Sequence, residues 1–117
     1  MEVWVSIAGE KKKYQGSFRS VMENLFHDGK DRDVKLFSIH APKKELRRFK
    51  RELRKNGKNL IETARKIALW FYTRDLRRAN RCIRLHRKKT DPVSTLKVER
   101  ARKLLEEVRP KIEALSQ

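Results

Sequence analysis

The N-terminal part of the chain alternates apolar and polar residues in the manner of a β-strand. Residues 1–8 place Val3, Val5 and Ile7 on one face and Trp4 on the other. Because side chains of a strand point alternately to its two faces, the three aliphatic residues are predicted to face a core. The segment therefore predicts a first strand.

Two further segments are compatible with strands of the same sheet. Residues 34–40 predict a strand that ends before Pro42, since a proline restrains the residue before it from helical geometry. A turn at Gly9 could pair the first strand with residues 11–15, although three consecutive lysines there suit a solvated loop equally well. The sheet is therefore predicted to have two or three strands.

A one-sided helix is predicted between these strands. Ser17 is a suitable N-cap, and Asp28 with Gly29 ends the pattern. The apolar residues recur every three or four positions and are Phe18, Val21, Met22, Leu25 and Phe26. The stripe is expected to cover one face of the sheet.

After Pro42 the whole chain follows a helical period. Residues 43–55 have a narrow apolar stripe with charge around the rest, and Asn56 with Gly57 supplies a stop. Residues 58–89 contain neither proline nor glycine, which predicts a second, long helix. Its centre, residues 67–72, is apolar all round and is expected to be buried on several sides, with its aromatic rings in the core.

The last helix is predicted to start at Asp91 and Pro92, a cap followed by a first-turn proline. Its apolar residues alternate steps of three and four and form a seam, here called the C-terminal seam: Val98, Ala101, Leu105, Val108, Ile112 and Leu115. Pro110 is expected to kink the helix or to divide it at residues 107–109. The short connection to the preceding helix predicts an antiparallel hairpin.

These elements predict an α+β fold. A short N-terminal sheet with one covering helix is followed by three mainly basic helices, namely a helix at residues 43–55, a long central helix and its C-terminal hairpin partner. With 117 residues the chain is predicted to form one domain, with a sheet-forming part (1–42), a basic helical part (43–89) and a C-terminal helix (90–117).

The charge of the chain is concentrated in one part of it. The net charge is +17, and residues 43–89 alone contribute +15, whereas each flank contributes +1. So much like charge repels itself in a compact fold unless a polyanion neutralises it. A solvated face would ordinarily mix signs, so the excess of Lys and Arg predicts a nucleic-acid partner.

The spacing of the basic residues predicts which faces would bind. Residues at steps of three and four lie on one flank of a helix, and arginine can engage phosphate oxygens bidentately. On the helix at residues 43–55 the candidates are Lys43, Lys44, Arg47, Arg48, Lys50, Arg51, Arg54 and Lys55. On the long helix they are Arg74, Arg77, Arg78, Arg81, Arg84, Arg87 and Lys88.

The sequence indicates the kind of nucleic acid only in part. We find no helix-turn-helix spacing, zinc-finger ligands or Gly-Xaa-Xaa-Gly loop that would read a base sequence. Arginine-lined helices suit recognition of the backbone and groove shape, so we favour structured or double-stranded RNA, with DNA as the alternative. Trp4 and Tyr14 are candidates for stacking on unpaired bases, although packing within the sheet is the favoured interpretation.

A small nuclease is a second hypothesis. His27, His40 and His86 could supply an acid and a base, and Asp28, Asp31 and Asp33 could hold a metal. The spacing of the aspartates matches no metal loop and suits a polar turn. Cys82 is expected to be a small buried residue. We therefore expect no catalytic site, no metal and no cofactor.

Other partners are also compatible with the sequence. The basic helices could dock an acidic protein partner, or the chain could form a homodimer through a sheet edge or the C-terminal seam. The longest apolar run, residues 67–72, is too short to span a bilayer, so we expect no membrane insertion. The expected location is intracellular and cytoplasmic, or the nucleoid or nucleus if the partner is DNA.

Overall fold

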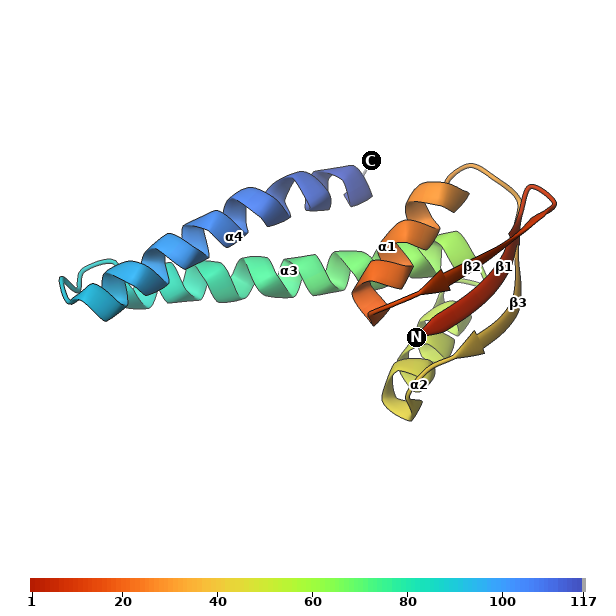
Figure 1. The fold of residues 1–117 in the computed structure, drawn as a ribbon, viewed down its shortest axis with the longest axis horizontal. Coiled ribbons are helices and arrows are strands. Elements are labelled where there is room, and N and C mark those ends of the chain that lie inside the picture. The colour runs from red at the N-terminus through yellow and green to blue at the C-terminus, as the bar shows by residue number, and fades with distance from the viewer. Residues whose placement is uncertain (117) are drawn as a thin grey trace. The chain divides into compact units, whose positions relative to one another are not determined.

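The computed structural model describes residues 1–116 and confirms the α+β class. The described residues form three strands and four helices, whose arrangement can be followed in Figure 1. Their bounds are β1 Glu2–Ile7, β2 Glu10–Gln15, α1 Phe18–Gly29, β3 Val34–His40, α2 Lys43–Lys55, α3 Leu60–His86 and α4 Pro92–Ser116. The chain divides into two compact units, residues 1–68 and 69–117, with α3 contributing to both. The single domain stays a prediction.

The first unit is built on an antiparallel sheet in the order β2-β1-β3. β1 and β2 form a hairpin whose two turn residues, Ala8 and Gly9, both have positive φ angles of 51° and 87°. Such a turn matches the right-handed twist of paired strands, which explains why the basic segment becomes a strand rather than a loop. Of the two alternatives that the sequence left open, the sheet of three strands is the one that forms.

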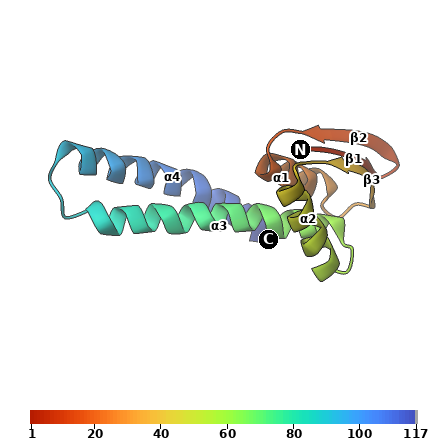
Figure 2. The ribbon, with the colours of Figure 1, turned by 90° about the horizontal axis from the view of Figure 1, so that it is seen from below.

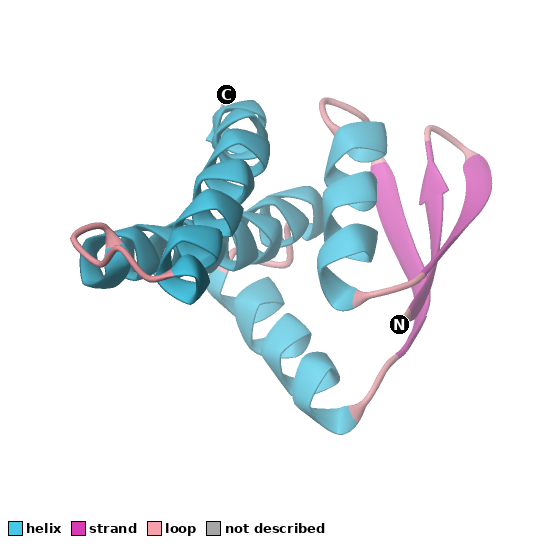
Figure 3. Ribbon diagram, turned by 60° about the vertical axis from the view of Figure 1, so that its left-hand side comes forward, coloured by secondary structure: helices cyan, strands magenta, loops and turns pink. Residues whose placement is uncertain are grey.

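One face of the sheet is covered by helices. α1 packs on β1 and β2, and Figures 2 and 3 show α1 and α2 on the same side of the sheet. Val3, Val5 and Ile7 are almost fully buried there with the predicted apolar stripe of α1. No element of this unit covers the opposite face of the sheet, as Figure 3 also shows.

The ends of the helices follow local hydrogen bonds. The Ser17 hydroxyl accepts a 3.2 Å bond from the backbone N–H of Ser20, so the predicted N-cap is confirmed. α2 ends at Lys55 with Asn56 as its C-cap, after which Gly57 has a φ of +59° and suits the left-handed position. α3 starts two residues later than predicted because Asn59 caps it, its Oδ1 accepting from the N–H of Glu62 at 3.0 Å.

The second unit is an antiparallel helical hairpin made by α4 and the α3 residues from 69 onward, which lie side by side in Figures 1 and 2. Ala79 of α3 is buried in one cluster with Ala101 and Leu105 of α4. Near the loop, the Cys82 thiol donates to the Lys97 carbonyl at 3.7 Å. The predicted hairpin is confirmed.

Two features of α4 bear on the sequence predictions, namely the position of Pro110 and the burial of the C-terminal seam. Pro110 lies inside a helix that continues to Ser116, so of the two predicted outcomes, a kink or a division at residues 107–109, the division does not occur. A proline removes one hydrogen bond of the ladder, and the packed helix tolerates that loss. The C-terminal seam is largely buried, with Ala101 and Leu105 against α3, so a homodimer through it would require the hairpin to open.

Candidate nucleic-acid interface

The first basic surface lies on α2, which forms because only one of its faces is apolar. Phe49 is 1% exposed, and the other faces are charged. Glu45 lies in the first turn and Arg54 with Lys55 in the last, which suits the helix dipole. Seven of the eight predicted residues are exposed, and Arg48 is half-buried. We call these eight residues the α2 basic face.

Local contacts hold some of these side chains near the helix. The Lys55 ammonium lies 3.8 Å from Glu52 Oε1, and Arg54 Nε donates to the Lys50 carbonyl oxygen at 3.5 Å. Exposed ion pairs of this kind stabilise by about 1 kcal/mol at most, so a phosphate can compete for these cations. The α2 basic face is therefore adaptable rather than rigid.

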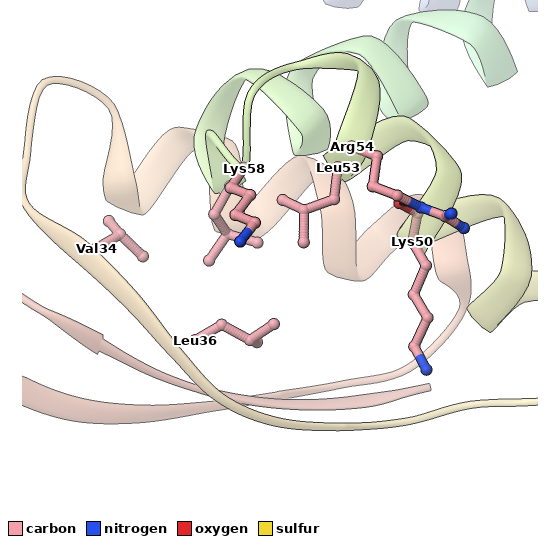
Figure 4. A pocket seen from close by; sticks show the side chains of 7 residues that line it. Val34, Leu36, Lys50, Leu53, Arg54 and Lys58 are labelled. Carbon is pink, nitrogen blue, oxygen red and sulfur yellow. Dashed lines mark hydrogen bonds between the residues drawn. The ribbon is translucent and has the colours of Figure 1, made fainter.

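A cavity of about 430 Å³ opens between β3 and α2. Figure 4 shows the side chains of Leu36 and Leu53 extending into the space between the strand and the helix, with Lys50, Arg54 and Lys58 around it. The lining combines an apolar floor with three cationic groups. Lys58 was not among the predicted residues, because its place beside α2 depends on the turn after Gly57.

The second basic surface lies on the part of α3 that belongs to the second unit. Arg77, Arg81 and Arg84 line one open hollow of about 480 Å³ together with Asn80. Their spacing of three and four residues stacks them along one flank. Arg78, Arg87 and Lys88 are also exposed. We call the hollow and these neighbours the α3 arginine face.

No carboxylate among residues 1–116 forms an ion pair with Arg77, Arg81 or Arg84. The only acid in residues 69–89 is Asp75, which lies 4.0 Å from Arg74 Nε. The hollow of the α3 arginine face thus holds three like charges with no carboxylate partner among residues 1–116, an arrangement that a bound anion would stabilise. Asn80 was not among the residues predicted from the sequence, because a single amide in a charged helix forms no pattern that would indicate a binding site.

Arg74 is set apart from the other predicted arginines. Its guanidinium carbon lies 5.1 Å from the centre of the Trp70 ring and 5.2 Å from that of Phe71. The side chain is half-buried, and its Nε is a buried donor without a hydrogen-bond partner. Arg74 is therefore packed on aromatic rings, whereas the other α3 candidates are exposed.

The aromatic residues of residues 67–72 are not all buried as predicted. Tyr72 is buried, and Lys111 Nζ lies 3.4 Å from its hydroxyl oxygen and 5.3 Å from its ring centre. Trp70, however, is 43% exposed, so its predicted place in the core is wrong. An all-apolar stretch does not indicate which of its side chains stays partly exposed in the fold.

The stacking candidates in the sheet also differ from one another. Trp4 is 39% exposed, whereas the Tyr14 hydroxyl donates to Asp28 Oδ2 at 2.6 Å. Burial first, and then this hydrogen bond, raises the pKa of Tyr14. Tyr14 therefore joins β2 to α1, and Trp4 remains available on the opposite face.

The groups considered for catalysis are dispersed. His27 Nε2 lies 4.0 Å from Glu23 Oε1, and His86 Nδ1 lies 3.3 Å from the Ser94 hydroxyl, where it joins the ends of α3 and α4. Within residues 1–116, no three His, Cys, Asp or Glu side chains are grouped in a way that could hold a metal. The aspartates that follow α1 lie in and beside the turn before β3.

A further salt bridge explains why one arginine of α3 does not belong to either basic face. Arg65 donates to both carboxylate oxygens of Glu62, at 3.0 and 2.6 Å. This hydrogen bonding lowers the pKa of the Glu62 carboxyl and raises that of Arg65. The two charges neutralise each other at the start of the helix.

Fold and surface together define an α+β protein with one cationic face in each unit. Over the described helices, no segment is both long and apolar enough to cross a membrane. No family model matches the chain, and no solved structure matches it. The chain is 46% identical over 117 residues to an uncharacterized protein of Aquifex aeolicus (strain VF5), a match that covers all of this chain and 92% of the relative. It belongs to the same family as that protein.

Proposed function

We propose that the protein binds nucleic acid, RNA in preference to DNA, by gripping the phosphate backbone without strong sequence specificity. The observation that carries the proposal is the α3 arginine face, where Arg77, Arg81 and Arg84 line one hollow and none is paired with a carboxylate of residues 1–116. Three guanidinium groups at helical spacing match a row of phosphates. The α2 basic face adds a second set of exposed cations.

The preference for RNA rests on shape. Neither basic face carries a helix in the arrangement of a known base-reading motif, and backbone contacts supply affinity without sequence information. Double-stranded RNA is recognised mainly through its phosphates and 2′-hydroxyls, which exposed arginines can reach. DNA binding is the alternative, and the same faces could instead dock an acidic protein. No catalysis is part of the proposal, and the cytoplasm is the proposed location.

The test compares two triple variants that lose the same charge from the same unit. In the first, Arg77, Arg78 and Arg81 are changed to Ala. In the control, Arg100, Arg102 and Lys103 of α4, which are also exposed, are changed to Ala. Binding of a labelled double-stranded RNA is measured from low to near-physiological salt, with duplex DNA, single-stranded RNA and single-stranded DNA as competitors.

We expect the α3 variant to bind at least tenfold more weakly and to reduce the slope of log affinity against log salt by about 2.7, since each phosphate contact contributes about 0.9. The control should change both quantities much less. Equal effects of the two triple variants would mean that the net charge alone determines RNA binding. Unchanged binding in the α3 variant would show that the α3 arginine face is not the binding surface. Shortened strands would favour the nuclease, and binding that survives nuclease treatment would favour a protein partner.

A further inference from the structure

The uncovered face of the sheet carries two exposed aromatic rings. Trp4 of β1 is 39% exposed and Phe37 of β3 is 59% exposed. Trp4 points away from the core because its neighbours Val3 and Val5 point into it. Large aromatic side chains usually dominate cores and interfaces, so two of them on one open face call for an explanation.

Phe37 reaches this face through an irregularity in the pairing of β1 with β3. Trp4 is paired with Ser38 and Val5 with Leu36, so Phe37 is an extra residue opposite the Trp4–Val5 step. A β-bulge of this kind re-aims side chains and is common beside functional sites. It also returns Ile39 to register with the buried Val3, so the core is kept while Phe37 is exposed.

Cationic side chains surround the two rings. Lys11 Nζ lies 5.6 Å from the centre of the Phe37 ring, and Lys13 Nζ lies 5.4 Å from that of Trp4. Lys35 occupies the same face, because it is paired with Ser6, which is paired in turn with Lys11. Trp4, Lys11, Phe37 and Ser38 together line a hollow of about 370 Å³. The face is thus aromatic in the middle and positive around it.

The one acid on this face holds the indole in place. Trp4 Nε1 donates to Glu2 Oε1 at 2.8 Å, and the same oxygen lies 3.8 Å from Lys13 Nζ. The hydrogen bond leaves the π-face of the indole unaffected while it fixes the orientation of the ring. A ring held in advance loses less conformational entropy when a ligand stacks on it.

We propose that this sheet face is a second nucleic-acid site, which stacks unpaired bases of a single strand on Trp4 and Phe37 while Lys11, Lys13 and Lys35 contact the flanking phosphates. Every base has a π-face, so aromatic platforms bordered by cations bind single strands with little sequence preference. Double-stranded nucleic acid keeps its bases stacked and cannot use such a surface. The proposal shares its ligand class with the proposed function but none of its residues.

The ordinary role of such residues makes a different prediction. Lysines over exposed rings stabilise the fold through cation–π contacts, and their stems shield apolar surface. If that were their whole role, substitutions would change the stability of the protein and leave its affinity for single strands unaffected. Binding measurements on folded variants therefore separate the two interpretations.

The first experiment uses the intrinsic fluorescence of Trp4. The chain has two tryptophans, so a Trp70→Phe variant leaves Trp4 as the only indole. A single-stranded oligouridine is titrated into this variant, and a duplex RNA of the same number of phosphates is titrated separately. We expect the single strand to quench the Trp4 emission in a saturable way and the duplex to do so far less. An unchanged emission with bound single strand would overturn the proposal.

The second experiment measures affinity. A double variant with Trp4→Leu and Phe37→Leu should bind the oligouridine at least tenfold more weakly, with its affinity for duplex RNA nearly unchanged. The control changes two exposed leucines of the second unit, Leu85 and Leu96, to Ala and should not affect either affinity. The triple variant at Arg77, Arg78 and Arg81 should lose its affinity for duplex RNA, while the single strand should still quench the Trp4 emission. This result would show that the two sites act separately. If the folded double variant bound the single strand as tightly as wild type, base stacking on Trp4 and Phe37 would be refuted. The proposed function would not be affected by that result.

Discussion

The Tyr14 hydroxyl donates a 2.6 Å hydrogen bond to the Asp28 carboxylate and so joins the edge strand β2 to the end of α1. β2 is otherwise rich in lysine and contributes little to the core. Tyr14 is one of its few half-buried residues. This single contact therefore helps to keep a polar edge strand on the sheet, next to the face that carries Trp4.

A Tyr14→Phe variant should lose about 1 kcal/mol of unfolding free energy at neutral pH, the usual contribution of one hydrogen bond. Burial and Asp28 raise the pKa of Tyr14 above its ordinary value of 10.0. A phenol whose pKa is raised on folding stabilises the folded state fully below the unfolded pKa and loses this effect as the pH rises above it. The difference between wild type and variant should therefore be constant up to about pH 10 and decrease above it.

Urea denaturation of both proteins between pH 7 and 11 checks this prediction. The lysines titrate in the same range, but they do so in both proteins, so their effect cancels in the difference. A difference that stays constant up to pH 11 would mean that the Tyr14 hydroxyl is not held in its neutral form by the fold.

A side chain at Gly29 is predicted to force its neighbours to shift and so to destabilise the fold. A Cβ built there would overlap Ile61 Cδ1 and lie 3.0 Å from Val34 Cγ2. A Gly29→Ala variant should therefore lower the unfolding free energy by about 1 to 3 kcal/mol, as overpacking does, although Ala is the better helix former. Asn24→Ala in the exposed part of the same helix is the control and should not destabilise the protein. Thermal denaturation of the two variants decides, and a Gly29→Ala protein as stable as wild type would contradict the close packing.

Much of the fold could be predicted because local patterns determine it. The strand at residues 34–40 and the helix at residues 43–55 have the predicted bounds, since Pro42 and Gly57 restrict the backbone directly. The hairpin of α3 and α4 followed from a short connection and a continuous seam. The predicted end of the long helix at residue 89 is three residues too late, because no proline or glycine marks the end of α3 at His86.

The parts that were missed depend on contacts between distant residues. The bulge at Phe37 is a property of the register between β1 and β3, and no sequence pattern within β3 indicates it. The exposure of Trp70 depends on which helix faces remain uncovered. The candidate binding residues were selected by charge and helical spacing alone, and that selection stays a prediction for nucleic-acid binding.

The hairpin is predicted to need small residues where its helices meet. Ala79 and Ala101 are both buried in the cluster that joins α3 to α4. An Ala101→Leu variant should lower the unfolding free energy by about 1 to 3 kcal/mol, because a larger side chain cannot enter a packed core without strain. Ala114→Leu is the matched control, since Ala114 lies on the exposed face of the same helix. Urea denaturation compares them, and equal stability of the two variants would argue against close contact at Ala101.

Arg74 and Arg77 lie on the same helix but are predicted to have different roles. Arg74 is half-buried against Trp70 and Phe71, whereas Arg77 is exposed in the hollow of the α3 arginine face. Arg74→Ala should lower the unfolding free energy by about 1 kcal/mol through the lost cation–π contacts and weaken RNA binding less than twofold. Arg77→Ala should leave the unfolding free energy within about 0.5 kcal/mol and weaken RNA binding several-fold.

Each of these two variants loses one positive charge, so net charge cannot account for a difference between them. Urea denaturation and RNA titration at one salt concentration give the four values needed. Equal losses of affinity would mean that Arg74 leaves the rings to bind phosphate, and the full arginine line would then act as one surface. A loss of affinity for Arg77→Ala alone would instead restrict the phosphate contacts to the side chains that line the hollow, because the Arg74 guanidinium packs on two rings.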